Sequence, residues 1–321
     1  MKKQQTTSEK ESRLLKMAAE LGITFIDLKR DFAFKWTFGT PGHEDLLLLL
    51  LKGLLPEKHI KSVELGPQEQ EPDREDAQGG IFDIYCETDD GSSLTIEMQV
   101  IPHDDFKDRM VFYSSFPIRN RVGQGVSTNS NRHNYLRYKL PPIYTIGILD
   151  FELQGVSKSN RVIRHFSIRE DEDDKSQFTD SIHYITVELP KFQKTTSELS
   201  SFQDFVLYAI KNMGMMDEIP REFSGKGLDK FFETCMFAHM NENMQMKYVR
   251  QMMAEMDRES QLATAVMHGE AKGRAEGRAE GRAEGEAIGK AQTAKAMKSE
   301  CLPMNIIAKC TGLTPEEIEA L

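Results

Sequence analysis

Two acidic residues in the first third of the chain, Asp83 and Glu97, have a spacing that could bring their carboxylates together. Each lies in a short β-prone run, and Asp-Asp-Gly between the runs is typical of a hairpin turn. In the second run polar residues alternate with apolar ones, and Gln99 follows Glu97 on the same side. The chemistry that such a trio could support is the binding of a divalent cation.

The alternation of side chains determines how the two runs must pair. Because a slip of one residue would exchange the two faces of a strand, the apolar rows meet only when even-numbered residues face even-numbered ones. The expected pairs are Phe82 with Met98, Ile84 with Ile96, and Cys86 with Leu94. This register places Asp83 directly opposite Glu97, with Cβ atoms about 4.5–5.5 Å apart. It also requires an odd-length connection, such as a three-residue loop with Gly91 in a left-handed conformation.

Two neighbouring carboxylates repel each other unless one is protonated or a cation lies between them. Magnesium or manganese suits oxygen ligands of this kind, and such an ion can polarise a phosphate and activate water. The amide of Gln99 could orient that water or contact a phosphate oxygen, although it cannot act as a base. The simpler alternative is that Asp83 and Glu97 are solvated acids on the exposed face of the hairpin.

The pattern D-x13-E-x-Q, with DFAFKWTFG upstream and FKDRMVFYSS downstream, resembles the PD-(D/E)xK nuclease family transposases, also called recombination-promoting nucleases. The similarity runs from about residue 28 to the glycine-rich tail. It implies Asp83 and Glu97 as metal ligands and Gln99 at the third catalytic position, where the wider superfamily has lysine. It also implies a Mg2+- or Mn2+-dependent endonuclease that cleaves DNA during recombination or transposition. This departure leaves open whether a lysine or arginine from elsewhere, such as Lys107 or Arg109, takes over the missing positive charge.

A basic stretch follows the hairpin and opposes the net charge of −10 of the whole chain. The residues expected to contact DNA phosphates are Lys107, Arg109, Tyr113, Arg119 and Arg121, with Arg132, Arg137 and Lys139 further on. Arg109 and Tyr113 are four residues apart and share a helix face that could overlook the hairpin. An ordinary exposed helix followed by a loop is the alternative.

The expected fold class is α/β: a restriction-endonuclease-like core with a central mixed β-sheet flanked by helices, plus a C-terminal helical extension. Helices are expected over residues 44–56 and 104–116, and strands over 60–65, 142–153, 162–168 and 183–189, with a loop over 66–80. Asp31 is expected to cap a helical turn. Asp31 and Glu44 are also candidate accessory acids, although a helix cap and a helix-start charge explain them equally well.

The organisation expected along the chain is a polar and helical lead over 1–27, the nuclease core over 28–190, a helical extension over 191–268, a spacer or helix over 269–297 and a short helical hairpin over 298–321. Residues 228–268 are expected to form one long helical region. The next segment repeats Gly with Ala, Glu and Arg at a period of four, and its six glycines favour a flexible or weakly coiled spacer. Oligomerisation through this helical region is the second interpretation.

The composition of the chain also bears on where the protein is located. There is no secretory signal, and the six leucines at 46–51 are far too few to span a bilayer, so a cytoplasmic location without membrane association is expected. Two alternatives to a DNA nuclease stay open. The protein could keep the nuclease fold as an inactive DNA-binding or assembly protein, which Gln99 in place of lysine favours, or it could cleave RNA.

Overall fold

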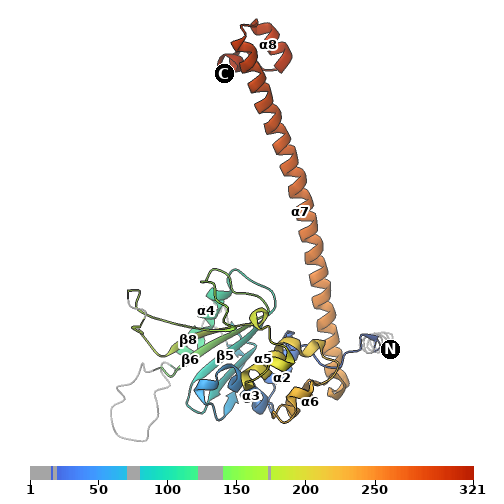
Figure 1. The fold of residues 1–321 in the computed structure, drawn as a ribbon. Helices are drawn as coiled ribbons and strands as arrows, with labels where there is room; N and C mark the ends of the chain where they lie inside the picture. Colours follow the sequence, from blue (N-terminus) through green and yellow to red (C-terminus); the bar gives the residue numbers. More distant parts are fainter. Residues whose placement is uncertain (1–15, 17–19, 71–79, 122–139, 173–174) are drawn as a thin grey trace, which may run out of the picture. The chain divides into compact units, whose positions relative to one another are not determined.

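The computed structural model describes residues 16, 20–70, 80–121, 140–172 and 175–321 of the chain (Figure 1). These residues belong to two compact units, Met1–Met252 and Met253–Leu321. The first unit contains every strand of the described chain, and the second is helical throughout.

A six-stranded mixed sheet organises the first unit. Its strands are β1 (Val63–Leu65), β4 (Ile84–Thr88), β5 (Ser93–Gln99), β6 (Ile143–Leu149), β7 (Ile163–Ser167) and β8 (Ile182–Glu188), in the order β1-β4-β5-β6-β8-β7. The central strands β5, β6 and β8 are parallel, and the outer pairs are antiparallel. The sheet confirms the predicted α/β class. Within residues 66–80, predicted to be a loop, two short strands also pair: β2 (Glu69–Gln70) and β3 (Gly80–Ile81).

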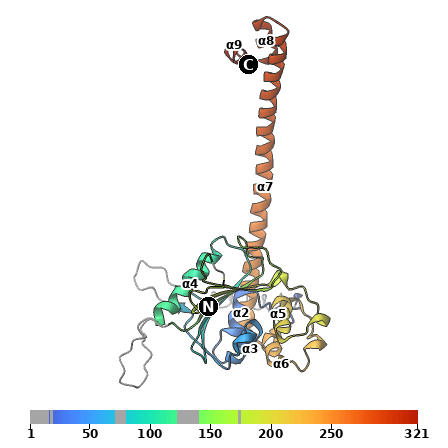
Figure 2. The ribbon, with the colours of Figure 1, turned by 60° about the vertical axis from the view of Figure 1, so that its left-hand side comes forward.

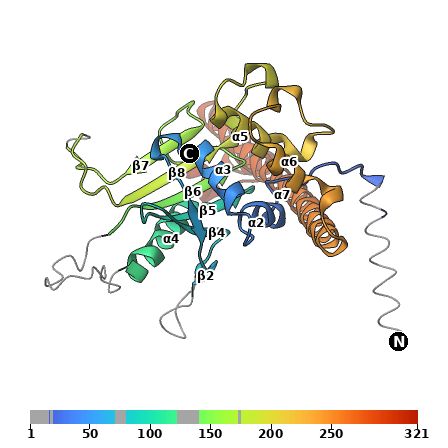
Figure 3. The ribbon, with the colours of Figure 1, turned by 90° about the horizontal axis from the view of Figure 1, so that it is seen from below.

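One face of the sheet is apolar and lies in the protein core. Ile84, Cys86, Leu94, Ile96, Ile146, Ile148, Ile185 and Val187 on this face are fully buried. The helices α2 (Asp31–Phe38), α3 (Glu44–Leu54) and α5 (Phe202–Asn212) lie on this side of the sheet, and α6 (Asp229–Cys235) lies nearby (Figures 2 and 3). The helix predicted to begin at Glu44 and end before Pro56 is therefore confirmed as α3.

The opposite face carries polar residues and is covered by a single helix, α4 (Phe106–Arg121) (Figure 3). Gly147 of β6 makes the close approach possible, because a Cβ atom there would lie only 2.6 Å from Cζ of Phe106. Phe106 and Met110 pack with Leu149 of β6. The predicted end at Phe116 was wrong: the helix continues beyond Pro117, since packing of buried Phe106, Met110 and Phe116 compensates for one missing backbone donor.

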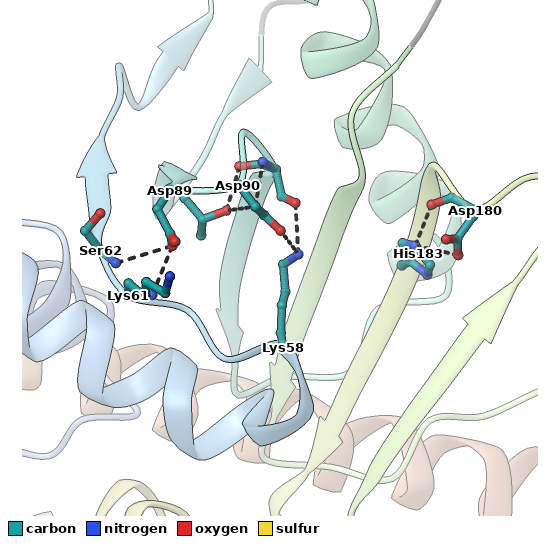
Figure 4. Close-up of polar contacts among 9 residues, drawn as sticks. Lys58, Lys61, Ser62, Asp89, Asp90, Asp180 and His183 are labelled. Carbon is teal, nitrogen blue, oxygen red and sulfur yellow. Dashed lines mark hydrogen bonds and ion pairs between the residues drawn. The ribbon is translucent and has the colours of Figure 1, made fainter.

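The turn between β4 and β5 has the predicted odd length. The Thr88 N–H donates to Ser92 O at 3.0 Å across a three-residue loop, and Gly91 adopts φ +79°. The Asp90 carboxylate accepts hydrogen bonds from Thr88 Oγ1 at 2.6 Å, the Ser92 N–H at 3.0 Å and Lys58 Nζ at 2.7 Å (Figure 4). These hydrogen bonds stabilise the turn, while the alternation of apolar and polar residues specifies the register of the hairpin.

The region predicted to form one long helix over 228–268 instead contains α6, a break around residues 236–241, and α7 (Glu242–Ser299). The start of α7 is part of the first unit, where Tyr248 and Val249 are buried. Tyr248 also accepts a hydrogen bond from the Asp27 N–H at 2.9 Å through its hydroxyl oxygen.

The glycine repeat is helical, so the flexible-spacer interpretation was wrong and the helical alternative holds. The residues between the glycines are Ala, Glu, Arg and Lys, which have high helix propensity. Oppositely charged pairs one turn apart support the helix, such as Arg274 with Glu270 at 3.0 Å and Lys272 with Glu276 at 3.7 Å.

The chain ends in the two predicted short helices, α8 (Met304–Thr311) and α9 (Pro315–Glu319). Gly312 ends α8 with φ +72°, and Thr314 Oγ1 accepts from the Glu317 N–H at 3.2 Å at the start of α9. Ile307 and Ile318 pack with Ala294 in a small core. Within the described part of the chain, no helix has the length and apolar content needed to cross a membrane.

Candidate metal and phosphate site

Asp83 lies immediately before β4, where the chain bends, and Glu97 lies in β5. The predicted pairs of Ile84 with Ile96 and Cys86 with Leu94 are confirmed. The third predicted pair is wrong, because the ladder ends at Ile84 and Phe82 does not face Met98. Because of the bend, the Phe82 ring packs instead under α4, 5.1 Å from the ring of Tyr113 and 5.6 Å from that of Phe116.

The bend lets each carboxylate bind the backbone of the other run. Glu97 Oε1 accepts a hydrogen bond from the Asp83 N–H at 3.1 Å, and Asp83 Oδ2 accepts one from the Met98 N–H at 2.8 Å. Both residues are buried, with only 8% of Asp83 and 4% of Glu97 exposed. They are therefore not the solvated surface acids of the simpler interpretation, although they lie on the polar face of the sheet.

Burial shifts both carboxyl groups toward the protonated form. Loss of solvation and then the charge of Asp83 raise the pKa of Glu97 to about 8. Burial also raises the pKa of Asp83, although the Lys35 ammonium opposes that shift. Two buried acids with raised pKa values have too little positive charge nearby to hold both ionised, which is the electrostatic condition that a bound cation relieves.

The cation nearest to Asp83 comes from α2. Lys35 Nζ lies 3.1 Å from Asp83 Oδ1 and 2.6 Å from Asp31 Oδ1. Burial lowers the pKa of Lys35, but the carboxylates of Asp83 and Asp31 together outweigh that effect and raise it. Sequence reasoning missed Lys35, because the i,i+4 spacing from Asp31 was the only signal in the sequence and it does not point to the hairpin.

The two candidate accessory acids have different positions. Asp31 is not a helix cap, because Arg30 precedes α2 and the Asp31 side chain binds Lys35 within the first turns. It therefore lies beside the acidic pair. Glu44 is not brought to this place; its two carboxylate oxygens accept from the Gly42 N–H at 3.2 and 3.0 Å, which fits a residue at a helix start.

Arg109 and Tyr113 of α4 lie on the other side of the carboxylates. The Arg109 guanidinium is 5.9 Å from the Tyr113 ring, and its charge acts to lower the pKa of Glu97. Burial and then the charge of Glu97 raise the pKa of Tyr113. Nε and Nη2 of Arg109 are buried, and neither has a hydrogen-bond partner within the described residues. These donors are suited to a phosphate oxygen.

The remaining predicted residues lie further out. Lys107 lines a cavity of about 240 Å³ beside the start of α4, and the Arg119 guanidinium lies 5.2 Å from the Phe116 ring. Arg121 ends α4, and its side chain is outside the description, as are Arg132, Arg137 and Lys139. Gln99 ends β5 with an intermediate exposure, on the side of Glu97 by strand alternation.

The acidic pair fits a hard divalent cation. The described residues contain no group of three or more His, Cys, Asp or Glu able to hold a metal, so a zinc-type site is absent from them. Magnesium needs fewer protein ligands, since one or two carboxylates suffice when water and phosphate oxygens complete the shell. Asp83 and Glu97 supply two such carboxylates within a few ångströms of each other's backbone.

The family comparison agrees with this fold. Residues 28–265 match the model of the PD-(D/E)XK nuclease family transposases. The chain belongs to this family. The matched segment includes α2, the hairpin, α4 and the rest of the sheet. No curated protein and no solved structure matches the chain.

Proposed function

We propose that this protein is a metal-dependent endonuclease that hydrolyses phosphodiester bonds in DNA. The observation that most supports this proposal is that Asp83 and Glu97 are buried next to each other. Each carboxylate accepts a hydrogen bond from the backbone of the other run. Asp83 and Glu97 would hold magnesium or manganese. When bound there, such an ion supplies Lewis acidity that polarises the phosphate and lowers the pKa of water.

The protein side chains would divide the remaining tasks by position. The Arg109 guanidinium and the Tyr113 hydroxyl, which lie close together on α4, would contact a phosphate oxygen. The Gln99 amide would orient the attacking water. The oxygen of that water forms a bond to phosphorus, the bond from phosphorus to the sugar oxygen breaks, and the departing oxygen gains a proton while the water loses one.

DNA would be positioned by the cations of α4, namely Lys107, Arg109, Arg119 and Arg121. Phosphate contacts of this kind give affinity without reading sequence, and they weaken as salt increases. The family to which the chain belongs supports the further proposal that this cleavage serves transposition or recombination.

The test is cleavage of supercoiled plasmid with Mg2+ or Mn2+, compared with EDTA. Asp83→Asn and Glu97→Gln keep the side-chain shape and should each slow nicking by about a hundredfold or more. Asp180→Asn is the matched control, because Asp180 pairs with His183 away from the acidic pair (Figure 4). Nicking by both variants at the wild-type rate would exclude the proposal.

A non-cleaving DNA-binding or assembly protein is the second candidate, and Gln99 in place of lysine is the observation that favours it. DNA binding without cleavage under any divalent ion would support this candidate. Side-by-side assays on single-stranded RNA and on DNA would determine which of the two nucleic acids is the substrate.

A further inference from the structure

Because Gln99 is neutral, the site lacks a positive charge at this position. A neutral amide at this position cannot supply the positive charge that lysine supplies in the wider superfamily. In the sequence, Lys107 and Arg109 are candidates for the substitute. In the structure Lys107 lines a separate cavity with Phe151 and Leu153, so it does not take this place.

Lys35 reaches the acidic pair from α2. Its Nζ lies 3.1 Å from Asp83 Oδ1, while the other oxygen of the same carboxylate accepts from the Met98 N–H. Met98 lies between Glu97 and Gln99 in β5. The Asp83 carboxylate is therefore held by the Lys35 ammonium at one oxygen and by the backbone of β5 at the other. The Lys35 side chain is 31% exposed, so part of it faces solvent at the edge of the acidic pair.

Two further contacts keep this ammonium in place. Asp31, one helical turn earlier on α2, lies 2.6 Å from Nζ and forms a second ion pair with it. The charge of Lys35 also acts to lower the pKa of Glu97, so its field extends over both carboxyl groups. Arg109 acts on Glu97 from the opposite element, α4. The acids thus lie between one cation from α2 and one from α4.

We propose that Lys35 takes the place of the lysine missing at position 99, as a fixed cation that orients Asp83 and contacts the scissile phosphate. This inference rests on the proposed nuclease function. It makes Lys35 a catalytic residue that acts through its charge alone, and no proton passes through it.

The test uses the full chain in five forms: wild type, Lys35→Met, Lys35→Arg, Gln99→Lys and the double variant Lys35→Met with Gln99→Lys. Lys58→Met is the matched control, because Lys58 also pairs with a hairpin aspartate, Asp90, at 2.7 Å, but at the turn (Figure 4). Circular dichroism establishes that each form is folded. Calorimetry gives the Mn2+ affinity, and single-turnover cleavage is measured at saturating Mn2+.

Lys35→Met should bind Mn2+ at least as tightly as wild type, because a competing cation is gone, yet cleave about a hundredfold more slowly. Lys35→Arg should lose less than about tenfold, since it keeps the charge. Adding Gln99→Lys to Lys35→Met should restore at least about tenfold of the rate, a recovery that a purely structural role does not explain. Lys58→Met should cleave at close to the wild-type rate.

Three results would overturn the assignment of Lys35: cleavage by Lys35→Met within about threefold of wild type, a loss of Mn2+ affinity as large as its loss of rate, or no recovery in a folded double variant. If wild type does not cleave, the nuclease proposal fails. A second measurement then tests whether Lys35 contacts a phosphate. Binding of an uncleavable phosphorothioate duplex in Ca2+ should then weaken about tenfold in Lys35→Met and recover in the double variant. Equal binding by all forms would exclude Lys35 as a phosphate contact.

Discussion

At the scale of single residues, the acidic pair differs from an ordinary cross-strand pair. The chain leaves the ladder at Asp83, and side-chain carboxylates accept backbone N–H groups from Asp83 and Met98. Burying two carboxylates costs free energy unless hydrogen bonds and positive charge compensate. Lys35 and Arg109 compensate in part, and a divalent cation would complete the compensation.

Replacing Glu97 by Gln should change how the stability of the metal-free protein depends on pH. The raised pKa means that the folded state holds a proton which the unfolded state releases from about pH 4.5 upward. Stability in EDTA should therefore fall as pH rises toward about 8. Glu97→Gln should remove most of this fall and stabilise the protein at about pH 8 by on the order of 2–4 kcal/mol.

Urea unfolding in EDTA at about pH 5 and about pH 8 measures this effect. Mn2+ added at about pH 8 should stabilise wild type, because it binds the folded state, and should stabilise Glu97→Gln much less. Parallel pH profiles for wild type and variant would show that Glu97 is already ionised in the folded metal-free protein.

Strand parity was enough to predict the partners of Ile84 and Cys86 and hence the approach of the two acids. It could not predict the bend, which removes Phe82 from the ladder, because the aromatic side chains that hold Phe82 come from α4. It could not predict Lys35 either. The position of α2 relative to the hairpin is a tertiary property, and no local period in the sequence encodes it.

At the scale of secondary-structure elements, the site depends on how closely α4 approaches the sheet. Gly147 pairs with Glu97 across β5 and β6, and the ring of Phe106 lies directly against it. Phe106 precedes Arg109 by three residues on α4. The contact between Phe106 and Gly147 therefore also determines how close Arg109 lies to the sheet.

Gly147→Ala should therefore destabilise the first unit and slow cleavage, because the new methyl group would lie 2.6 Å from Phe106 Cζ. The cost expected for such overpacking is about 1–3 kcal/mol. Phe106→Leu should relieve the clash, so the double variant should lose less stability than the sum of the single losses. Additive losses, measured by urea unfolding, would mean that the two residues do not contact each other.

Substitution of the six repeat glycines by alanine should raise the helicity of a peptide covering residues 267–297. Each glycine in a helix interior costs about 1 kcal/mol relative to alanine, and none of these six has a neighbouring side chain that a methyl group would meet. Far-ultraviolet circular dichroism would detect the increase. The same low helicity in both peptides would show that the segment is not intrinsically helical.

The repeat also marks a limit of sequence reasoning at this scale. The cost of each glycine favoured a flexible spacer, but the propensity of Ala, Glu and Arg and their i,i+4 pairs favours the helix that the structure has. Composition alone did not show which of these contributions determines the structure of the segment. The capping residues of the last helix were a clearer signal, and Thr314 does cap α9.

At the scale of the whole molecule, the first unit extends past the sheet into the start of α7. Tyr248, Val249 and Met252 are buried, and the Gln251 side chain accepts from the Phe32 N–H of α2 at 2.8 Å. The first turns of α7 thus hold α2, the element that carries Lys35, although they follow the sheet by many residues.

A chain that ends at residue 258 should therefore keep the first unit folded, whereas one that ends at residue 241 should be strongly destabilised. Burial of each of these three side chains contributes about 1.5–3 kcal/mol. Thermal unfolding followed by near-ultraviolet circular dichroism compares the two. Equal melting of both chains would show that α7 adds nothing to the first unit.

Anomalous diffraction from crystals soaked in Mn2+ would show whether Asp83 and Glu97 jointly bind a divalent cation. We expect a peak in contact with one oxygen from each carboxylate, absent from crystals of Asp83→Asn. A Mn2+ peak at other residues, with none between these two carboxylates, would contradict it.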